Sequence, residues 1–205
     1  MAISLVKVCG MRIPHNIEEL TQLPINYIGF IFYKKSKRFV STLPLVEMPD
    51  TIKKVGVFVN STIEDVKTEI AHGLQAVQLH GDESAAYCQS IKDTGVEVIK
   101  AFGIGSVMDW KQLEPYTTVV DYFLFDTSSA QYGGTGITFD WQILKEYPYD
   151  TPYFLSGGLD IDNIPTAQQI TDPRLVGLDL NSRFEIEPGL KNINRIKEAL
   201  KIIKR

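Results

Sequence analysis

The sequence predicts an α/β fold, a (β/α)8 TIM barrel that forms a single domain over residues 1–205. Eight apolar runs recur along the chain, and their starts lie about 21 to 31 residues apart, the length of one βα unit. Most runs are nearly continuous rather than alternating, as is typical of parallel strands buried on both faces. The alternative, an open doubly wound sheet, would normally carry G-x-G-x-x-G after its first strand, and residues 9–12 do not match that pattern.

The eight predicted strands share a high content of β-branched and aromatic residues. No linker, low-complexity segment or shift in composition separates them, so nothing in the sequence divides the chain into two domains. The predicted strands are residues 5–9, 27–32, 54–59, 76–80, 97–102, 122–126, 153–156 and 175–180.

Helical patterns fill most of the intervals between these strands. Asn16 is a candidate N-cap for the first helix, and Ser61–Glu64 matches a capping box for the next. Gly95 is placed to end the helix that starts near residue 82. In the interval 43–52, two prolines leave room for a short helix only. Further helices are predicted over residues 107–113, 140–147, 162–169 and 192–203.

Composition excludes several classes of protein. The chain is 44% hydrophobic and 22% charged, as in ordinary globular proteins, and its net charge of −4 argues against a nucleic-acid partner. The cationic stretch 34–38 is interpreted as a solvated loop or as part of a site. No apolar run approaches the length of a membrane span. With two cysteines, Cys9 and Cys88, that are not expected to pair, we expect a cytoplasmic protein.

In a barrel of this kind, the active site lies at the carboxyl ends of the strands. Gly157 and Gly158 follow the seventh strand, and such a pair lets backbone N–H groups approach an anion closely. The turn 181–183 after the eighth strand offers further N–H donors, so the two loops together predict a phosphate site. The alternative for Gly157-Gly158 is an ordinary tight turn.

A long glycine-containing loop follows the sixth strand and includes Gly133 and Gly134. Loops of this length inside compact domains are usually functional, so these glycines are expected to close over a ligand or to bring amides near a phosphate. A flexible connector is the alternative.

Two residues at strand ends carry the predicted proton chemistry. Cys9 ends the first strand next to a glycine and is a candidate base, although a small buried hydrophobe is the commoner state of free cysteine. Lys7 lies on the same face of that strand, one layer deeper, and needs a partner, either Asp126 or Asp179. Asp126 follows three apolar residues, and burial would keep its carboxyl protonated as a candidate acid. A helix cap or an ion-pair partner is the alternative for Asp126.

Three further side chains follow strand ends. Arg38 can hold a carboxylate with two parallel hydrogen bonds, and Gln78 and His80 are expected to line the pocket.

A series of motifs, in order along nearly the whole chain, resembles the phosphoribosylanthranilate isomerase family. No single motif is specific, but their combination and order are. The motifs are Lys7-Val8-Cys9-Gly10, Gly29-Phe30-Ile31-Phe32, Ser36-Lys37-Arg38-Phe39-Val40, Val55-Gly56-Val57-Phe58-Val59-Asn60, Gln78-Leu79-His80-Gly81-Asp82-Glu83, Asp126-Thr127, Gly133-Gly134-Thr135-Gly136, Phe139-Asp140-Trp141, Ser156-Gly157-Gly158-Leu159 and Pro188-Gly189-Leu190-Lys191.

The resemblance implies an Amadori rearrangement in tryptophan biosynthesis, without cofactor or metal. By likeness to the family, Asp126 protonates the furanose ring oxygen of N-(5′-phosphoribosyl)anthranilate, and the ring opens to a Schiff base. Cys9, as a thiolate, then removes the proton from C2′, and Arg38 holds the anthranilate carboxylate. The implied partner is this small phosphorylated sugar, and the expected assembly is a monomer or a homodimer.

The chain departs from the family after the eighth strand. The family usually reads Ser-Ser-Gly-Val-Glu there, whereas this chain reads Asn181-Ser182-Arg183-Phe184-Glu185. We therefore expect a phosphate site with altered geometry, in which Asp179, Ser182 and Arg183 contact the substrate.

Two other functions compete with this interpretation. One is a histidine-pathway isomerase with the same barrel fold. That family resembles this chain in fold but has a pair of aspartates, one of which would stand at the position of Cys9. A non-catalytic barrel that binds a phosphorylated ligand would have no use for Cys9 and Asp126 together.

Overall fold

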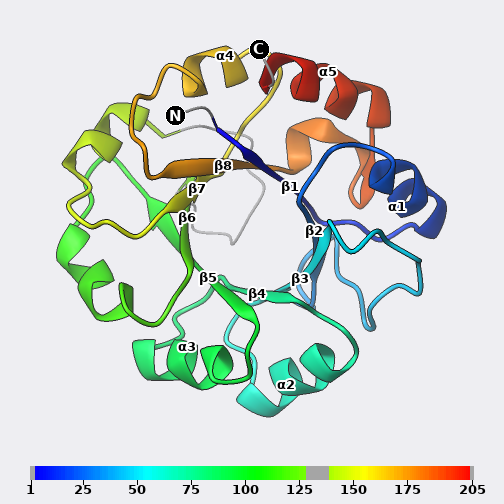
Figure 1. Cartoon of the computed structure of the whole chain (residues 1–205), viewed down its shortest axis with the longest axis horizontal. Helices are drawn as coiled ribbons and strands as arrows, with labels where there is room; N and C mark the ends of the chain where they lie inside the picture. The colour runs from blue at the N-terminus through cyan, green and yellow to red at the C-terminus, as the bar shows by residue number, and fades with distance from the viewer. Residues whose placement is uncertain (1–2, 128–138, 204–205) are drawn as a thin grey trace.

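Eight parallel strands close into a barrel in chain order, and helices surround it (Figure 1). The computed structural model describes residues 3–127 and 139–203. Each predicted strand is present, with ends that differ by at most two residues, and the closed sheet excludes the open doubly wound alternative. The strands are β1 (Leu5–Cys9), β2 (Tyr27–Ile31), β3 (Lys53–Phe58), β4 (Ala76–Leu79), β5 (Glu97–Ile104), β6 (Tyr122–Thr127), β7 (Tyr153–Leu155) and β8 (Leu175–Leu180).

The helices outside the barrel are short. They are α1 (Pro14–Thr21), α2 (Ile63–Ala71), α3 (Ala85–Lys92), α4 (Ile164–Ala167) and α5 (Ile193–Ile203). Two predicted helices are instead 3₁₀ helices, η1 (Trp110–Tyr116) and η2 (Trp141–Glu146), and Pro115 near the end of η1 lacks the N–H that an α-helix would use. A third 3₁₀ helix, η3 (Ser182–Phe184), leads into a small hairpin of β9 (Glu185–Glu187) and β10 (Leu190–Lys191), which the sequence did not predict.

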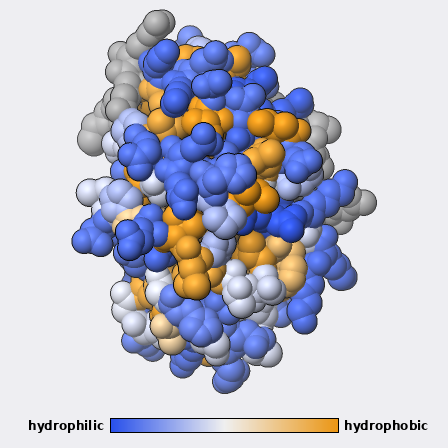
Figure 2. Space-filling view, turned by 90° about the vertical axis from the view of Figure 1, so that its right-hand side faces the viewer, coloured by the Kyte–Doolittle hydropathy of each residue, from blue (hydrophilic) through white to orange (hydrophobic). Residues whose placement is uncertain are grey.

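The predicted short helix in the interval 43–52 is absent, because its prolines interrupt the hydrogen bonds that a helix needs. This side of the barrel lies at the right in Figure 1, and Figure 2 shows it as a largely hydrophilic face with a few apolar patches. No helix in ranges 3–127 and 139–203 has both the length and the apolar character that crossing a membrane would require.

The predicted cap Asn16 is wrong: α1 has Ile13 at its N-cap position, and Asn16 lies inside the helix, where its side chain hydrogen-bonds the backbone of Lys191.

The predicted cap of α2 is shifted by one residue. The side chain of Thr62, not of Ser61, accepts the N-terminal hydrogen bond of α2, from the backbone of Asp65 at 3.1 Å. Ser84 caps α3 in the same way, and Gly95 ends that segment with a φ of +88°.

The barrel interior is mainly apolar toward the amino ends of the strands and polar toward their carboxyl ends. Seven buried residues of β2–β7, among them Ala76, Leu124 and Phe154, form one apolar cluster. Residues two positions apart along a strand share a face, so Gln78 and Asp126 follow directly above two members of this cluster. Apart from the ion pair of Lys7 and Asp179, the polar side chains of the site therefore lie above an apolar layer, at the carboxyl ends of the strands.

Candidate active site

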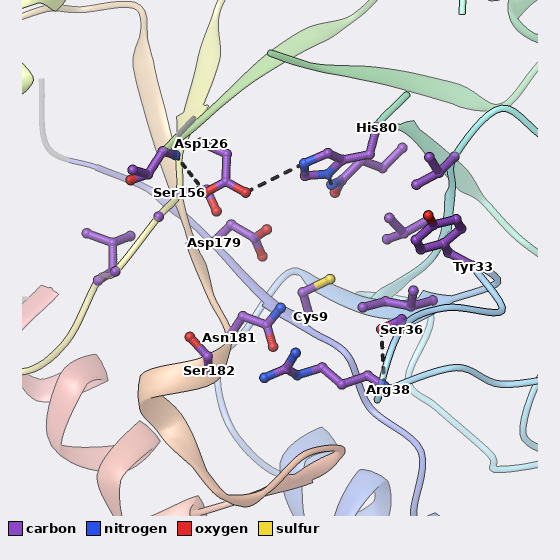
Figure 3. Close-up of a pocket in the computed structure, with 18 residues that line it drawn as sticks. Cys9, Tyr33, Ser36, Arg38, His80, Asp126, Ser156, Asp179, Asn181 and Ser182 are labelled. Carbon is purple, nitrogen blue, oxygen red and sulfur yellow. Dashed lines mark hydrogen bonds and ion pairs between the residues drawn. The ribbon is translucent and has the colours of Figure 1, made fainter. Parts of the chain in front are cut away.

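A pocket opens at the carboxyl ends of the strands, and it encloses about 850 Å³ together with its mouth. Figure 3 shows Cys9, Asp126 and His80 around it at the ends of three strands, and Arg38 from the loop after β2. Its lining residues are Cys9, Ile31, Tyr33, Ser36, Arg38, Val57, Val59, Gln78, His80, Asp126, Thr127, Ser156, Gly157, Gly158, Leu159, Asp179, Asn181 and Ser182.

A buried ion pair lies beneath the thiol. Lys7 and Asp179 are paired across β1 and β8, and Nζ of Lys7 lies 3.0 and 2.9 Å from the two carboxylate oxygens. Of the two partners that the sequence allowed for Lys7, the structure selects Asp179. Burial lowers the pKa of Lys7, but the Asp179 carboxylate and then the Cys9 thiol outweigh it and raise that pKa above its usual value. Lys7 is therefore a fixed positive charge at the base of the pocket.

Cys9 has room because a glycine faces it. Gly29 is its neighbour on β2, and a Cβ at that position would lie 2.7 Å from Sγ of Cys9. Burial raises the pKa of the Cys9 thiol above its usual value, and the Asp179 carboxylate adds to this rise. Lys7 lowers the pKa of Cys9, but not enough to reverse the effect of burial. Cys9 is therefore a neutral thiol at neutral pH.

Asp126 points into the same pocket from the end of β6 (Figure 3). Burial raises the pKa of Asp126 to about 6, although the backbone N–H of Thr127 donates to its Oδ1 at 2.8 Å and opposes the rise. The direction agrees with the expectation from the sequence. A pKa of about 6 nevertheless leaves most of the carboxyl ionised at pH 7 before a ligand fills the pocket.

His80 and Gln78 form a hydrogen-bonded pair beside Asp126. Nε2 of Gln78 donates to Nδ1 of His80 at 2.8 Å, so the ring proton is on Nε2, which lies 3.5 Å from Oδ2 of Asp126. Burial and the charges of Lys100 and Lys7 lower the pKa of His80 to about 4, so the imidazole is neutral. Oε1 of Gln78 is buried without a hydrogen-bond partner among the described residues, and it can accept a hydrogen bond from a ligand.

Two glycines with positive φ form the turn after β7. Gly157 and Gly158 have φ values of +86° and +66°, and a Cβ on Gly157 would collide with Thr127 and lie 2.8 Å from Oδ1 of Asp126. This close packing brings the turn against the acid. Ser182 of η3 also lines the pocket, so the two loops after β7 and β8 border it together. Backbone amides in such turns bind phosphate in many barrels.

Arg38 lines the pocket from the loop after β2, opposite Asp126 in Figure 3. Its guanidinium makes a two-point contact with Glu185: Nε lies 2.8 Å from Oε1, and Nη2 lies 2.6 Å from Oε2. A carboxylate of the protein itself thus holds one edge of the arginine that the resemblance assigned to a substrate carboxylate.

Most of the predicted site residues meet in this pocket. Cys9, Asp126, Arg38, Gln78, His80, Gly157, Gly158, Asp179 and Ser182 all line it.

Arg183 does not line the pocket: its side chain is exposed, which is how η3 accommodates the bulk that replaces the family's glycine. Gly133 and Gly134 lie outside the described residues. The roles of all these residues stay predictions.

Sequence reasoning missed several pocket residues and two that support them. Thr127 and Ser156 line the pocket, and their positions at strand ends were a usable signal. Asn181 also lines it, from the turn 181–183 that the sequence predicted as part of the phosphate site. Glu185 and Lys191 lie just behind it; the segment 181–185 and the motif that contains Lys191 pointed to this region, but neither residue was expected to act in the site. Within the described ranges, no group of three His, Cys, Asp or Glu side chains is placed to hold a metal ion.

The fold and the site define a (β/α)8-barrel enzyme with its site at the carboxyl rim. The family model of N-(5′-phosphoribosyl)anthranilate isomerase matches residues 6–202. The chain is 46% identical to the N-(5′-phosphoribosyl)anthranilate isomerase of Parabacteroides distasonis, over 97% of this chain and 93% of that protein. It belongs to the phosphoribosylanthranilate isomerase family.

Two solved structures are also similar, each 31% identical with a TM-score of 0.79 and covering 98% of both chains. One is a phosphoribosylanthranilate isomerase in complex with reduced 1-(o-carboxyphenylamino)-1-deoxyribulose 5-phosphate. The other consists of monomers of the dimeric phosphoribosylanthranilate isomerase from Thermotoga maritima.

Proposed function

We propose that this chain converts N-(5′-phosphoribosyl)anthranilate into 1-(2-carboxyphenylamino)-1-deoxyribulose 5-phosphate, an isomerisation in tryptophan biosynthesis, with Asp126 as general acid and Cys9 as general base. The observation that carries the proposal is that a thiol and a carboxyl of raised pKa face one pocket from β1 and β6. The membership of the chain in the isomerase family supplies the substrate.

The pocket offers one group for each part of this substrate. Gly157, Gly158 and Ser182 border the end where backbone amides can bind the phosphate. Arg38 enters from the loop after β2, with its guanidinium beside Asn181 and Ser182 in Figure 3, and it can hold the anthranilate carboxylate. The ribose then lies between Cys9 and Asp126.

Each catalytic group acts once in this scheme. The Asp126 carboxyl gives its proton to the ring oxygen, the C1′–O bond breaks, and the anthranilate nitrogen forms a Schiff base with C1′. The Cys9 thiolate removes the proton from C2′, and the electron pair moves to the nitrogen. The resulting enolamine becomes the ketose.

The pKa shifts favour the shared proton on Cys9 rather than on Asp126, the reverse of what the scheme needs. Cys9 is a thiol and Asp126 is mostly a carboxylate at pH 7, whereas the scheme needs the thiolate and the neutral acid. The pair of thiol and carboxylate and the pair of thiolate and carboxylic acid each hold one proton. They differ only in whether Cys9 or Asp126 carries it. A ligand that closes the pocket excludes water from Asp126 and raises its pKa further, and the positive Schiff base then favours the Cys9 thiolate.

This pairing predicts a particular pH dependence. Below pH 6 both groups are protonated and no base is available, so kcat/KM should rise with pH through about 6 and level off at neutral pH. Initial rates between pH 5 and 8 measure it. The substrate phosphate also ionises near pH 6, so the Asp126→Asn variant is the control. Its residual activity should lose this inflection, and an unchanged inflection would contradict the assignment to Asp126.

Replacing Arg38 tests the carboxylate end of the pocket. Arg38→Ala should raise KM about 10- to 100-fold, the effect of losing hydrogen bonds between charged groups, and should change kcat less. Steady-state kinetics measure both constants. Lys35→Ala is the matched control, because Lys35 is an exposed cation of the same loop that does not line the pocket. An unchanged KM in Arg38→Ala would mean that the carboxylate binds elsewhere.

Turnover of N-(5′-phosphoribosyl)anthranilate by the purified chain, followed by the loss of its fluorescence, tests the function itself. A cytoplasmic location, a single domain over residues 1–205 and a monomer or homodimer belong to the same proposal. The two free, buried cysteines support the location. Light scattering of the purified chain would measure the assembly.

A further inference from the structure

A cluster of three charged residues lies behind the pocket wall, and the proposed reaction does not use two of them. Glu185 begins β9 and Lys191 ends β10, so the small hairpin after β8 brings both to Arg38. The side chains of Glu185 and Lys191 are 5% and 0% exposed, although charged residues of a two-stranded hairpin are normally in solvent. Burying these charges costs free energy, so their contacts call for a reason.

We infer that Glu185, held in place by Lys191, is a positioning residue that fixes the guanidinium of Arg38 for the carboxylate of the substrate. The inference deepens the proposed function and rests on it. Glu185 accepts hydrogen bonds from Nε and Nη2 of Arg38, which are one edge of the guanidinium. In the described parts of the chain, no residue accepts a hydrogen bond from Nη1. The Nη1–Nη2 edge is therefore left for a second carboxylate.

Lys191 keeps this arrangement attractive for an anion. Nζ of Lys191 lies 2.7 Å from Oε1 of Glu185, so two cations surround one carboxylate and the cluster keeps one net positive charge. Without Lys191, Glu185 would cancel the charge of Arg38. Burial lowers the pKa of Lys191 to about 8 against the pull of Glu185, which leaves the ammonium protonated at neutral pH.

The cluster also borders the proposed phosphate end of the pocket. Nζ of Lys191 donates to Oδ1 of Asn181 at 2.8 Å, and Asn181 directly precedes Ser182 at the proposed phosphate end. Gly10 has a φ of +80°, and a Cβ there would lie 2.5 Å from Cδ of Arg38 and 3.0 Å from Oδ1 of Asn181. The aliphatic part of Arg38 thus crosses the end of β1 at Gly10, one residue after Cys9. A shift of Arg38 would therefore also move Cys9.

The test uses the whole chain and the reduced product analogue 1-(o-carboxyphenylamino)-1-deoxyribulose 5-phosphate as the probe. Glu185→Gln should weaken binding of this analogue about tenfold and raise KM similarly, with kcat changed far less, because one hydrogen bond to a charged group is lost. Glu187→Gln is the matched control, since Glu187 is exposed on the same short strand. It should bind as the unmodified chain does.

A double-mutant cycle separates positioning from a general structural role. If Glu185 acts through Arg38, adding Glu185→Gln to Arg38→Ala should weaken binding no further. Independent effects that multiply would overturn the inference, as would a Glu185→Gln variant with unchanged affinity. If Glu185→Gln does not fold, Glu185→Asp takes its place. It keeps the charge beside Lys191 but withdraws the carboxylate from Arg38, so it should weaken binding as well.

The same measurements distinguish this inference from the proposed function. Failure of the unmodified chain to turn over its substrate would reject the function, and binding of the analogue would still report on Glu185. A chain that neither binds the analogue nor turns over the substrate would reject both. A fully active chain whose affinity does not depend on Glu185 would reject the inference alone.

Discussion

Asp126→Asn should lower kcat by about 100- to 10,000-fold, the usual contribution of general acid catalysis. The amide has nearly the same shape as the carboxyl and can still accept the hydrogen bond from the backbone of Thr127, so the local fold should persist. It has no proton to give to the ring oxygen at the moment the C1′–O bond breaks. Steady-state turnover of N-(5′-phosphoribosyl)anthranilate measures the loss, and titration with the reduced product analogue shows whether the pocket is intact.

A carboxylate at the opposite end of the same strand provides the control. Asp121 precedes β6, and its Oδ2 accepts a hydrogen bond from the backbone of Val98 at 2.8 Å, far from the pocket lining. Asp121→Asn should change stability more than kcat. Turnover of Asp126→Asn close to that of the unmodified chain would remove Asp126 from the role of acid.

Cys9→Ser should cause a loss of similar size, about 100- to 10,000-fold in kcat. A hydroxyl fits the space that Gly29 leaves for the thiol, so packing should change little. The hydroxyl ionises at far higher pH than a thiol, and the positive charge of Lys7 below it cannot make up the difference. The chain would then lack a base for the C2′ proton, while substrate binding should stay nearly the same.

Cys88→Ser is the matched control for the thiol. Cys88 is a second buried, free cysteine, but it lies in α3, away from the pocket. Its replacement should leave kcat unchanged. A Cys9→Ser variant as active as the Cys88→Ser variant would show that another group removes the C2′ proton.

The sequence predicted the barrel well because its strands carry a strong local signal. A strand buried on both faces is apolar over most of its length, and most of the eight strands are. The outer helices carry a weaker signal, because a stretch such as 107–113 has helical spacing whether it folds as an α-helix or as the 3₁₀ helix η1. The hairpin of β9 and β10 has no apolar pattern of its own, so its sequence alone does not predict it.

The site was predictable where its residues stand at strand ends, since the barrel brings all strand ends to one rim. Cys9 and Asp126 could be found in this way. The contact between Arg38 and Glu185 joins residues 147 positions apart, and no local pattern encodes it. The protonation state of Cys9 could not be predicted from the sequence either. Its pKa depends on the opposing effects of burial, Lys7 and Asp179, whose sizes follow from the three-dimensional structure.

The neutral state of Cys9 before substrate binds has a consequence for the chemical durability of the protein. Oxidants and electrophiles react with a thiolate and hardly at all with a thiol. A base kept as a thiolate throughout would be open to peroxide and would pass through sulfenic acid to forms that cannot be reduced again. Burial raises the pKa of the Cys9 thiol, so under the proposed scheme the sulfur becomes a reactive thiolate only while the substrate covers it.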